Sequence, residues 1–361
     1  MVCCKGRPDL DLQRSVQVKQ NAYNHKVRIF ESSQGARIAQ LPLNAFPDFW
    51  VYAYLVLYEE YCLLIDSGSG FHNSDQHLEE GFQAASALLD RALDFADLSH
   101  ILITHGHIDH FGGLPFLRQR TKAKIGVHEL DQLNLTHTEE RLLLVARRLE
   151  RYLLEAGVSA ARSRELVNIY RMTKLSYQPG RVDFTYEDIG MGLGPFEMLH
   201  VPGHCAGQVV IRLHDVLFCG DHVLSEITPH QAPEHLSLHT GLSHYLQSLE
   251  SCQTWSEGVQ LALGGHNEPI NHLSARIDEI QELHYQRLDE FLTHFKEPLT
   301  IADISRRCFG ELHGYNILLA LEEAGAHVEY LHQRGLLEIA NRDELESTPS
   351  QVPIRYQTAK Y

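Results

Sequence analysis

Long hydrophobic runs are absent from this chain of 361 residues. The longest uninterrupted apolar segment, residues 49–58, is far shorter than the roughly 20 residues that a membrane-spanning helix needs. Residues 1–17 contain no apolar core of the kind that marks a secretory signal peptide. We therefore expect no membrane helix and no export of the chain.

Paired cysteines are absent as well. The seven cysteines are odd in number and scattered along the chain, and none belongs to a CxxC motif. A chain of this length can bury a core without disulfides, and the pattern is typical of reduced thiols. The sequence therefore predicts a cytoplasmic protein.

Basic residues are few relative to acidic residues. The chain has 31 Lys and Arg residues against 47 Asp and Glu residues, which gives a formal net charge of −16. Proteins that bind nucleic acid normally present a basic face, so this class is disfavoured. The partner that we expect is a small-molecule substrate, and a homo-oligomer remains open.

The order of apolar patterns predicts a mixed α/β fold. The hydrophobic content of 43% and the charged content of 22% are those of a folded globular chain, and the length suggests two domains. Apolar runs at 50–57, 62–65 and 100–104 are typical of buried strands, and apolar residues between 78 and 92 recur at helical spacing. Strand, helix, strand is the order of a sheet covered by helices. We expect further strands at 182–186, 196–200, 209–213, 216–219 and 259–263, a helix at 242–253 and a helical insertion at 129–181.

The pattern changes after residue 275. Apolar residues from 273 to 295 predict a long helix, and Thr300 followed by Asp303 predicts a capping box that opens a second one. A third helix is expected from 316 to 331, with an apolar strand at 336–339. Three helices and a small strand pair suggest a winged-helix-like domain at 276–343, and residues 344–361 are expected to form a loose tail.

The segment His-Gly-His-Ile-Asp-His at 105–110 carries the strongest chemical signal. His105, His107, Asp109 and His110 follow a predicted strand and lie within six residues. Imidazoles and carboxylates are ligands for borderline metals such as zinc. The sharp turn at a strand end allows neighbouring side chains to face one cavity. The segment therefore predicts a metal site.

Three further candidate ligands also follow predicted strands. His204 follows Pro202-Gly203, His266 follows Gly264-Gly265, and Asp221 follows the strand at 216–219. An isolated histidine is usually a solvated or core residue. The same layout at four separate strand ends makes coincidence improbable and predicts that these side chains share one site.

Together these motifs resemble those of the metallo-β-lactamase-fold hydrolases. HGHIDH at 105–110, PGHCAGQ at 202–208, FCGDH at 218–222 and GGHNEPI at 264–270 occur in the family's order, preceded by DSGSG at 66–70. The resemblance spans about residues 25–275 and implies a four-layer αββα sandwich with two divalent ions, zinc first and iron or manganese as alternatives. It implies His105, His107 and His204 as ligands of one ion, Asp109, His110 and His266 as ligands of the other, and Asp221 as their bridge. Asp66 would support a ligand histidine, and Cys205 replaces the usual Ser or Thr beside the third histidine.

The C-terminal helices resemble those of a branch that carries a winged-helix module. This branch is related to a mitochondrial lactamase-like endoribonuclease and to bacterial acyl hydrolases. Residues 281–343 contain six basic and eleven acidic residues, a balance that disfavours contact with a phosphate backbone. A packing or dimerisation role is the preferred interpretation of this module.

The insertion has the opposite charge. Residues 137–181 contain nine basic and five acidic residues, among them Arg147, Arg148 and Arg151. In the resembled fold, insertions at this place cap the metal cleft. Either these arginines attract an anionic substrate, or they lie on an ordinary solvated helix face.

The resemblance favours a glyoxalase-II-like hydrolase of acyl thioesters, esters or lactones, such as an acyl-CoA. Water ionised by the metals would be the nucleophile, with Asp109 and Asp221 as the catalytic carboxylates. Two alternatives remain open at this stage: a phosphodiesterase or endoribonuclease that uses the same metals, and a non-catalytic metal-binding regulator.

Overall fold

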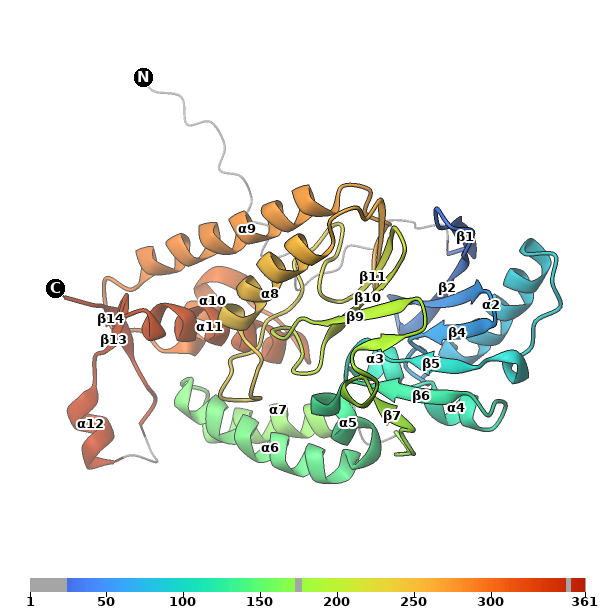
Figure 1. Cartoon of the computed structure of the whole chain (residues 1–361). Helices are drawn as coiled ribbons and strands as arrows, with labels where there is room; N and C mark the ends of the chain where they lie inside the picture. Colours follow the sequence, from blue (N-terminus) through green and yellow to red (C-terminus); the bar gives the residue numbers. More distant parts are fainter. Residues whose placement is uncertain (1–24, 173–176, 349–351, 361) are drawn as a thin grey trace, which may run out of the picture.

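The computed structural model describes residues 25–172, 177–348 and 352–360, which form two facing sheets with helices on their outer sides (Figure 1). The segment on which the absence of a signal peptide was predicted lies outside these residues. Among the described residues, no helix has both the length and the apolar character needed to cross a bilayer.

The first sheet has seven strands in chain order, and the second has five in the order β12-β11-β10-β9-β8. The first sheet comprises β1 (Arg28–Glu31), β2 (Arg37–Phe46), β3 (Phe49–Tyr58), β4 (Tyr61–Ile65), β5 (His100–Leu102), β6 (Lys124–Val127) and β7 (Phe184–Thr185). The second comprises β8 (Gly192–Leu193), β9 (Phe196–His200), β10 (Val209–Leu213), β11 (Val216–Gly220) and β12 (Leu261–Gly264). Neighbouring strands from β1 through β4 pair antiparallel, and neighbouring strands from β4 through β7 pair parallel. Strand β7 is shorter than the strand predicted at 182–186.

The burial of β3 shows why its sequence is an uninterrupted apolar run. Successive side chains of a strand point to opposite faces of the sheet. Tyr54 and Val56 pack between the two sheets, and Ala53 and Leu55 pack against the helices on the outer face. Both faces of this strand are buried, so polar residues have no place in it. The resulting helix–sheet–sheet–helix layering confirms the predicted αββα sandwich.

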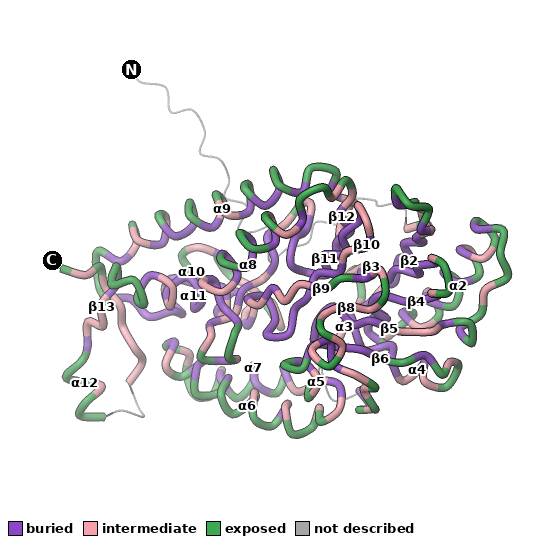
Figure 2. Tube along the Cα trace, in the orientation of Figure 1, coloured by how far each residue is buried: buried purple, intermediate pink, exposed green. Residues whose placement is uncertain are grey.

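Helices cover both outer faces of the sandwich. The first sheet is covered by α2 (Ser74–Leu88) and the short α3 (Ile108–Phe111) and α4 (Leu114–Arg118), and the second by α8 (Leu242–Trp255) and α9 (Leu273–His294). The predicted insertion forms α5 (Glu129–Thr136), α6 (Thr138–Glu155) and α7 (Ala160–Met172). Figure 2 shows exposed residues along the outer sides of α6 and α9 and buried residues on their inner sides.

The C-terminal region has the three predicted helices followed by a small strand pair. These elements are α9, α10 (Ile301–Phe309), α11 (Asn316–Gln333), β13 (Leu337–Ile339), α12 (Arg342–Ser347) and β14 (Tyr356–Thr358). The predicted capping box is present, because the Thr300 and Asp303 side chains each accept the other's backbone amide. The loose tail was a wrong prediction: β14 pairs antiparallel with β13, and Tyr356 also pairs with Leu299. The winged-helix comparison stays a prediction.

The insertion and the C-terminal helices share one hydrophobic core. Leu149 and Tyr152 of α6 belong to the same cluster of buried residues as Phe291 of α9 and Leu321 of α11. The Tyr152 hydroxyl donates a hydrogen bond to the Leu321 carbonyl. A side chain at Gly325 would collide with that hydroxyl. The two regions therefore pack against each other directly, although about 170 residues separate them.

Helix α9 also holds the loop that follows β11. Arg276 is 8% exposed. Its Nε donates to the Leu224 carbonyl at 2.7 Å, and its Nη2 donates to the Ile227 carbonyl at 2.9 Å. Because these are charge-assisted bonds in a buried place, their loss leaves desolvated carbonyls behind.

We predict that Arg276→Met lowers the free energy of unfolding by about 2–3 kcal/mol, because two buried carbonyls lose their donor. Urea denaturation measures the change. Arg307→Ala serves as the matched control: that side chain is 40% exposed and contacts Glu297, so its loss should cost at most about 0.5 kcal/mol. Equal effects of the two substitutions would contradict the anchoring role of Arg276.

Candidate metal centre

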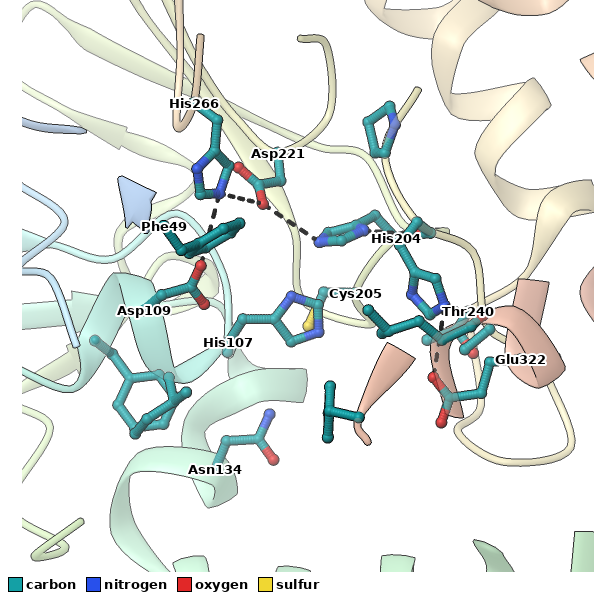
Figure 3. A pocket seen from close by; sticks show the side chains of 18 of the residues that line it. Phe49, His107, Asp109, Asn134, His204, Cys205, Asp221, Thr240, His266 and Glu322 are labelled. Atoms are coloured by element: carbon teal, nitrogen blue, oxygen red, sulfur yellow. Dashed lines mark hydrogen bonds and ion pairs between the residues drawn. The ribbon is translucent and has the colours of Figure 1, made fainter. Parts of the chain in front are cut away.

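Four strand ends deliver polar side chains to one edge of the sandwich. The loop after β5 carries His105 and His107 and leads into α3 with Asp109 and His110, while the loops after β9, β11 and β12 carry His204, Asp221 and His266. Figure 3 shows His107, Asp109, His204, Asp221 and His266 directed toward a common space. The structure thus brings together all seven side chains that the sequence singled out as metal ligands.

The Asp221 carboxylate lies at the middle of this cluster. Its Oδ2 is 3.2 Å from Nε2 of His266, 3.5 Å from Nε2 of His110 and 3.7 Å from Nε2 of His204. Nε2 of His105 is 4.0 Å away. Asp221 thus lies between the two predicted ligand groups.

The remaining ligands form two groups on either side of Asp221. One donor atom from each of His105, His107 and His204 lies within 4.8 Å of the others, and the same holds for Asp109, His110 and His266. The Asp109 carboxylate is 3.6 Å from both His110 and His266. These are the two groups that the sequence resemblance implied.

Contacts outside the cluster determine which nitrogen of each ring faces inward. Nδ1 of His204 is 2.7 Å from the His230 carbonyl, and Nδ1 of His266 is 2.7 Å from the Trp50 carbonyl. A carbonyl can only accept, so both rings carry their proton on Nδ1. In their neutral form both rings therefore direct the Nε2 lone pair into the cluster, as metal ligands require.

Asp66 gives the same orientation to His110. Its Oδ2 is 2.8 Å from His110 Nδ1, and it also accepts from the Thr104 amide and hydroxyl. Asp66 has a φ of 59°, in the left-handed region that few non-glycine residues adopt. This turn at the end of β4 aims the carboxylate beneath the HGHIDH loop.

The electrostatics of the cluster fit a bound cation. Burial lowers the pKa of His105 well below its usual value, and the neighbouring His110 lowers it further. Burial opposes ionisation of Asp221, yet the adjacent His266 and His110 hold the pKa of this carboxyl well below its usual range. Burial disfavours the charged form of both rings, yet Asp221 and Asp109 raise the pKa of His110 well above its usual value and that of His266 to about 10. The ionised carboxylates are therefore balanced by positive charge, which these rings or a bound cation can supply.

Unpartnered atoms test whether a metal fits. Sixteen side-chain atoms of the described residues are buried without a hydrogen-bond partner, and three of them lie in this cluster: His110 Nε2, His204 Nε2 and Asp221 Oδ1. Buried polar atoms in folded proteins nearly always have a partner. Histidine nitrogens and carboxylate oxygens are ligands of divalent metals, so the residues present fit such ions.

Cys205 has a supporting position instead of facing the cluster as a ligand. Its thiol is 3.2 Å from Oδ2 of Asp131 on α5, and that oxygen also accepts the Gly106 amide at 2.7 Å. Burial and the Asp131 carboxylate raise the pKa of the Cys205 thiol well above its usual value, so the thiol is a neutral donor. A Cβ at Gly106 or Gly207 would collide with Asp131, which explains the two glycines.

Several supporting residues had no signal in the sequence. Asp131 is an isolated acid in a helical insertion, and Trp50 and His230 act through their backbone carbonyls. Every residue has a backbone carbonyl, so a contact made through that carbonyl cannot be recognised from the residue type. Only the spacing of strand ends could have suggested that these segments meet.

The cluster opens into a cavity of about 620 Å³. The structure does not bring Arg147, Arg148 or Arg151 into it, because these residues are exposed on the side of α6 away from the lining residues Leu142, Val145 and Leu149. The insertion contributes Arg141 instead. The periodicity of α6 accounts for the difference, since lining residues recur every three or four positions.

A second buried group of possible ligands lies between α9 and α11. It consists of His284, Glu323 and His327. Arg287 Nη1 is 3.7 Å from Glu323 Oε1, and Gln231 N donates to Glu323 Oε2. Burial raises the pKa of Glu323 to about 7 although Arg287 lowers it. Within the part of the chain that the structure describes, His284 Nε2 and Glu323 Oε1 are buried without a hydrogen-bond partner. The contact that the structure assigns to this group is the anchoring of the loop that contains Gln231.

Facing sheets with a His and Asp cluster at one edge define a class of metal-dependent hydrolases. A family model described as the metallo-beta-lactamase superfamily matches residues 48–264. The chain belongs to the metallo-β-lactamase superfamily.

Curated relatives are similar over part of the chain. A hydroxyacylglutathione hydrolase of Aeromonas hydrophila is 27% identical over 248 residues, which cover 66% of this chain and 74% of the relative. The probable metallo-hydrolase YqgX of Bacillus subtilis is 24% identical over 174 residues, covering 47% of this chain and 64% of its own length.

Two solved structures share the fold. A metallo-beta-lactamase family protein of Thermus thermophilus has a TM-score of 0.65 at 24% identity and covers 89% of this chain and 98% of its own. A beta-lactamase domain protein of Burkholderia ambifaria has a TM-score of 0.69 at 21% identity and covers 92% and 94%. Both similarities extend over the C-terminal helices as well as the sandwich, since they cover about nine tenths of the chain.

We predict that Cys205→Ser is more stable than Cys205→Ala by about 1–2 kcal/mol, because a hydroxyl can donate to Asp131 and a methyl group cannot. Urea denaturation of the two variants measures the difference. Equal stabilities would show that the thiol only fills space.

Proposed function

We propose that this protein is a hydrolase that uses two divalent metal ions, zinc in the first instance, to cleave an acyl thioester, ester or lactone. The observation that carries the proposal is the convergence of seven ligand side chains, with three unpartnered buried atoms, beside a substrate-sized cavity. The relatives named hydroxyacylglutathione hydrolase support the thioester class, since such a substrate is a thioester.

His105, His107 and His204 would hold one ion, Asp109, His110 and His266 the other, and Asp221 would contact both. Divalent ions supply ionisation of water near neutral pH and polarisation of a carbonyl oxygen.

The chain's own residues orient the reaction. Asp109 and Asp221 both line the cavity, so their carboxylates can accept a proton from the attacking water. The water oxygen adds to the acyl carbon, the C–S or C–O bond breaks, and the departing thiolate or alkoxide takes up that proton. The products are a thiol or alcohol and a carboxylic acid, which releases the second proton of the water to solvent and becomes a carboxylate.

We also propose a role for each region of the chain. Residues 1–275 form the catalytic domain with the cap at 129–181, and residues 276–343 form a module that closes the cavity. Cytoplasmic location follows from the same proposal, since acyl-CoA is an intracellular substrate.

We predict that the zinc-loaded protein hydrolyses acyl-CoA or S-lactoylglutathione, and that Asp109→Ala lowers kcat by on the order of 1,000-fold, because one ion loses a ligand. His272→Ala is the matched control, since His272 is exposed and outside the cluster. Product formation with a thiol reagent measures both rates.

Two outcomes would contradict this proposal. Faster turnover of bis-p-nitrophenyl phosphate or single-stranded RNA than of any thioester would favour the phosphodiesterase alternative. Full metal content with no hydrolysis would favour a non-catalytic regulator.

We predict that Asp66→Asn weakens metal affinity about 10- to 100-fold, because His110 loses the carboxylate that orients its ring. Competition with a chromophoric chelator measures the affinity. Asp278→Asn on the exposed side of α9 should leave it unchanged. Unaltered affinity in Asp66→Asn would remove Asp66 from the metal centre.

A further inference from the structure

The cavity beside the metal cluster extends away from the ligands between two regions that are distant in sequence. One wall comes from α6 and α7 of the cap, and the opposite wall comes from the start of α11 and the loop after β11. Figure 3 shows Glu322 of α11 and Thr240 on the side of the cavity away from Asp109. A substrate bound at the metals can therefore extend into the space between the cap and the C-terminal helices.

This remote part of the cavity is mainly apolar. The cap contributes aliphatic side chains and one aromatic ring, and the facing wall contributes similar groups. These lining residues are Leu142, Val145, Leu149 and Tyr170 on one side, and Leu224, Ile227, Leu236, Tyr315 and Leu319 on the other. Apolar surface of this kind favours a ligand group that water solvates poorly.

Charged groups in the lining do not suit a peptide ligand. Outside the metal cluster and the buried Asp131, the charged side chains that line the cavity among the described residues are Asp48, Arg141 and Glu322. Arg141 Nε donates to Asn134 Oδ1 at 3.1 Å, and Glu322 lies 3.6 Å from His230 Nε2. Two acids and one cation give no pocket for the two carboxylates of glutathione.

The walls are held in place by buried contacts. The Tyr152 hydroxyl bonds the Leu321 carbonyl across the junction of α6 and α11. Arg287 Nη1 donates to Thr228 Oγ1 at 2.7 Å, and the His230 ring lies 3.1 Å from the Leu319 carbonyl. The cavity is therefore preformed, and a ligand need not order its walls on binding.

We propose that the space between α6 and α11 binds the apolar acyl chain of the substrate, so that the protein prefers a medium-chain acyl thioester or ester to a hydroxyacyl glutathione conjugate. This rests on the proposed hydrolase function, because the metal cluster is taken to bind the acyl carbonyl. The cavity of about 620 Å³ includes the space beside the metal cluster, and what remains is large enough for a chain of about eight carbons. The thiol or alcohol part, with any anionic group it carries, extends out of the cavity.

The test uses zinc-loaded protein and N-acetylcysteamine thioesters of acetate, butanoate, hexanoate and octanoate, whose leaving group is small and neutral. We expect kcat/KM to rise about threefold per added methylene, and at least 100-fold from acetyl to octanoyl, because each methylene is buried. S-lactoylglutathione should be a poorer substrate than the octanoyl thioester.

Two variants narrow the cavity from opposite walls. Val145→Trp and Leu319→Trp should each reduce the ratio of octanoyl to acetyl kcat/KM by at least tenfold, because the indole occupies the space of the chain. Leu144→Trp is the matched control: Leu144 neighbours Val145 on α6 but is 49% exposed and does not line the cavity. It should leave the ratio unchanged.

A binding measurement separates this proposal from the hydrolase function. By isothermal titration calorimetry, octanamide should bind the wild-type protein at least tenfold more tightly than butanamide, and Val145→Trp should abolish that difference. Tight octanamide binding without turnover of any ester or thioester would overturn the hydrolase function and retain the acyl pocket. Turnover that is equal for acetyl and octanoyl substrates, or faster for S-lactoylglutathione, would overturn the acyl pocket.

Discussion

The constraint on which the structure depends is the crowding of buried imidazoles around one carboxylate oxygen. Oδ2 of Asp221 lies between 3.2 and 4.0 Å from the Nε2 atoms of four histidines. When neutral, the rings of His204 and His266 carry their proton on the outward Nδ1, so their Nε2 lone pairs face this oxygen. Burial disfavours protonation of His266, yet the buried carboxylates raise its pKa to about 10, so the positive charge that the oxygen needs comes either from a protonated ring or from a bound cation. The strand ends, Asp66 and the carbonyls of Trp50 and His230 all serve to maintain this arrangement.

The metal centre and the cavity depend on the same supporting contacts. The His230 carbonyl orients His204, and the His230 ring lies against the Leu319 carbonyl of α11. Glu323 of the same helix accepts the amide of Gln231, the next residue along the loop. The C-terminal helices thus shape one wall of the cavity and also hold a partner of a ligand histidine. A module that only packed on the sandwich would do neither.

The parts of the site that depend on side-chain identity could be predicted from sequence motifs. The seven candidate ligands stand in four short motifs at strand ends, so their convergence and the sandwich could be predicted together. Asp131 and the carbonyl of Trp50 could not, because one is an isolated acid and the other acts through the backbone. Helical periodicity alone could have predicted that Arg147 and Arg148 are exposed, because it places them on the side of the helix opposite Leu142 and Leu149. Strand β13 was expected at 336–339, whereas its partner β14 is a three-residue segment outside any apolar run and was not predicted.

The central claim is that this cluster holds two divalent cations, and anomalous X-ray diffraction at the zinc absorption edge tests it most directly. Crystals of the zinc-loaded protein should show two anomalous peaks, one enclosed by His105, His107 and His204 and the other by Asp109, His110 and His266. A single peak, or zinc bound only elsewhere on the chain while these side chains keep their positions, would contradict the claim.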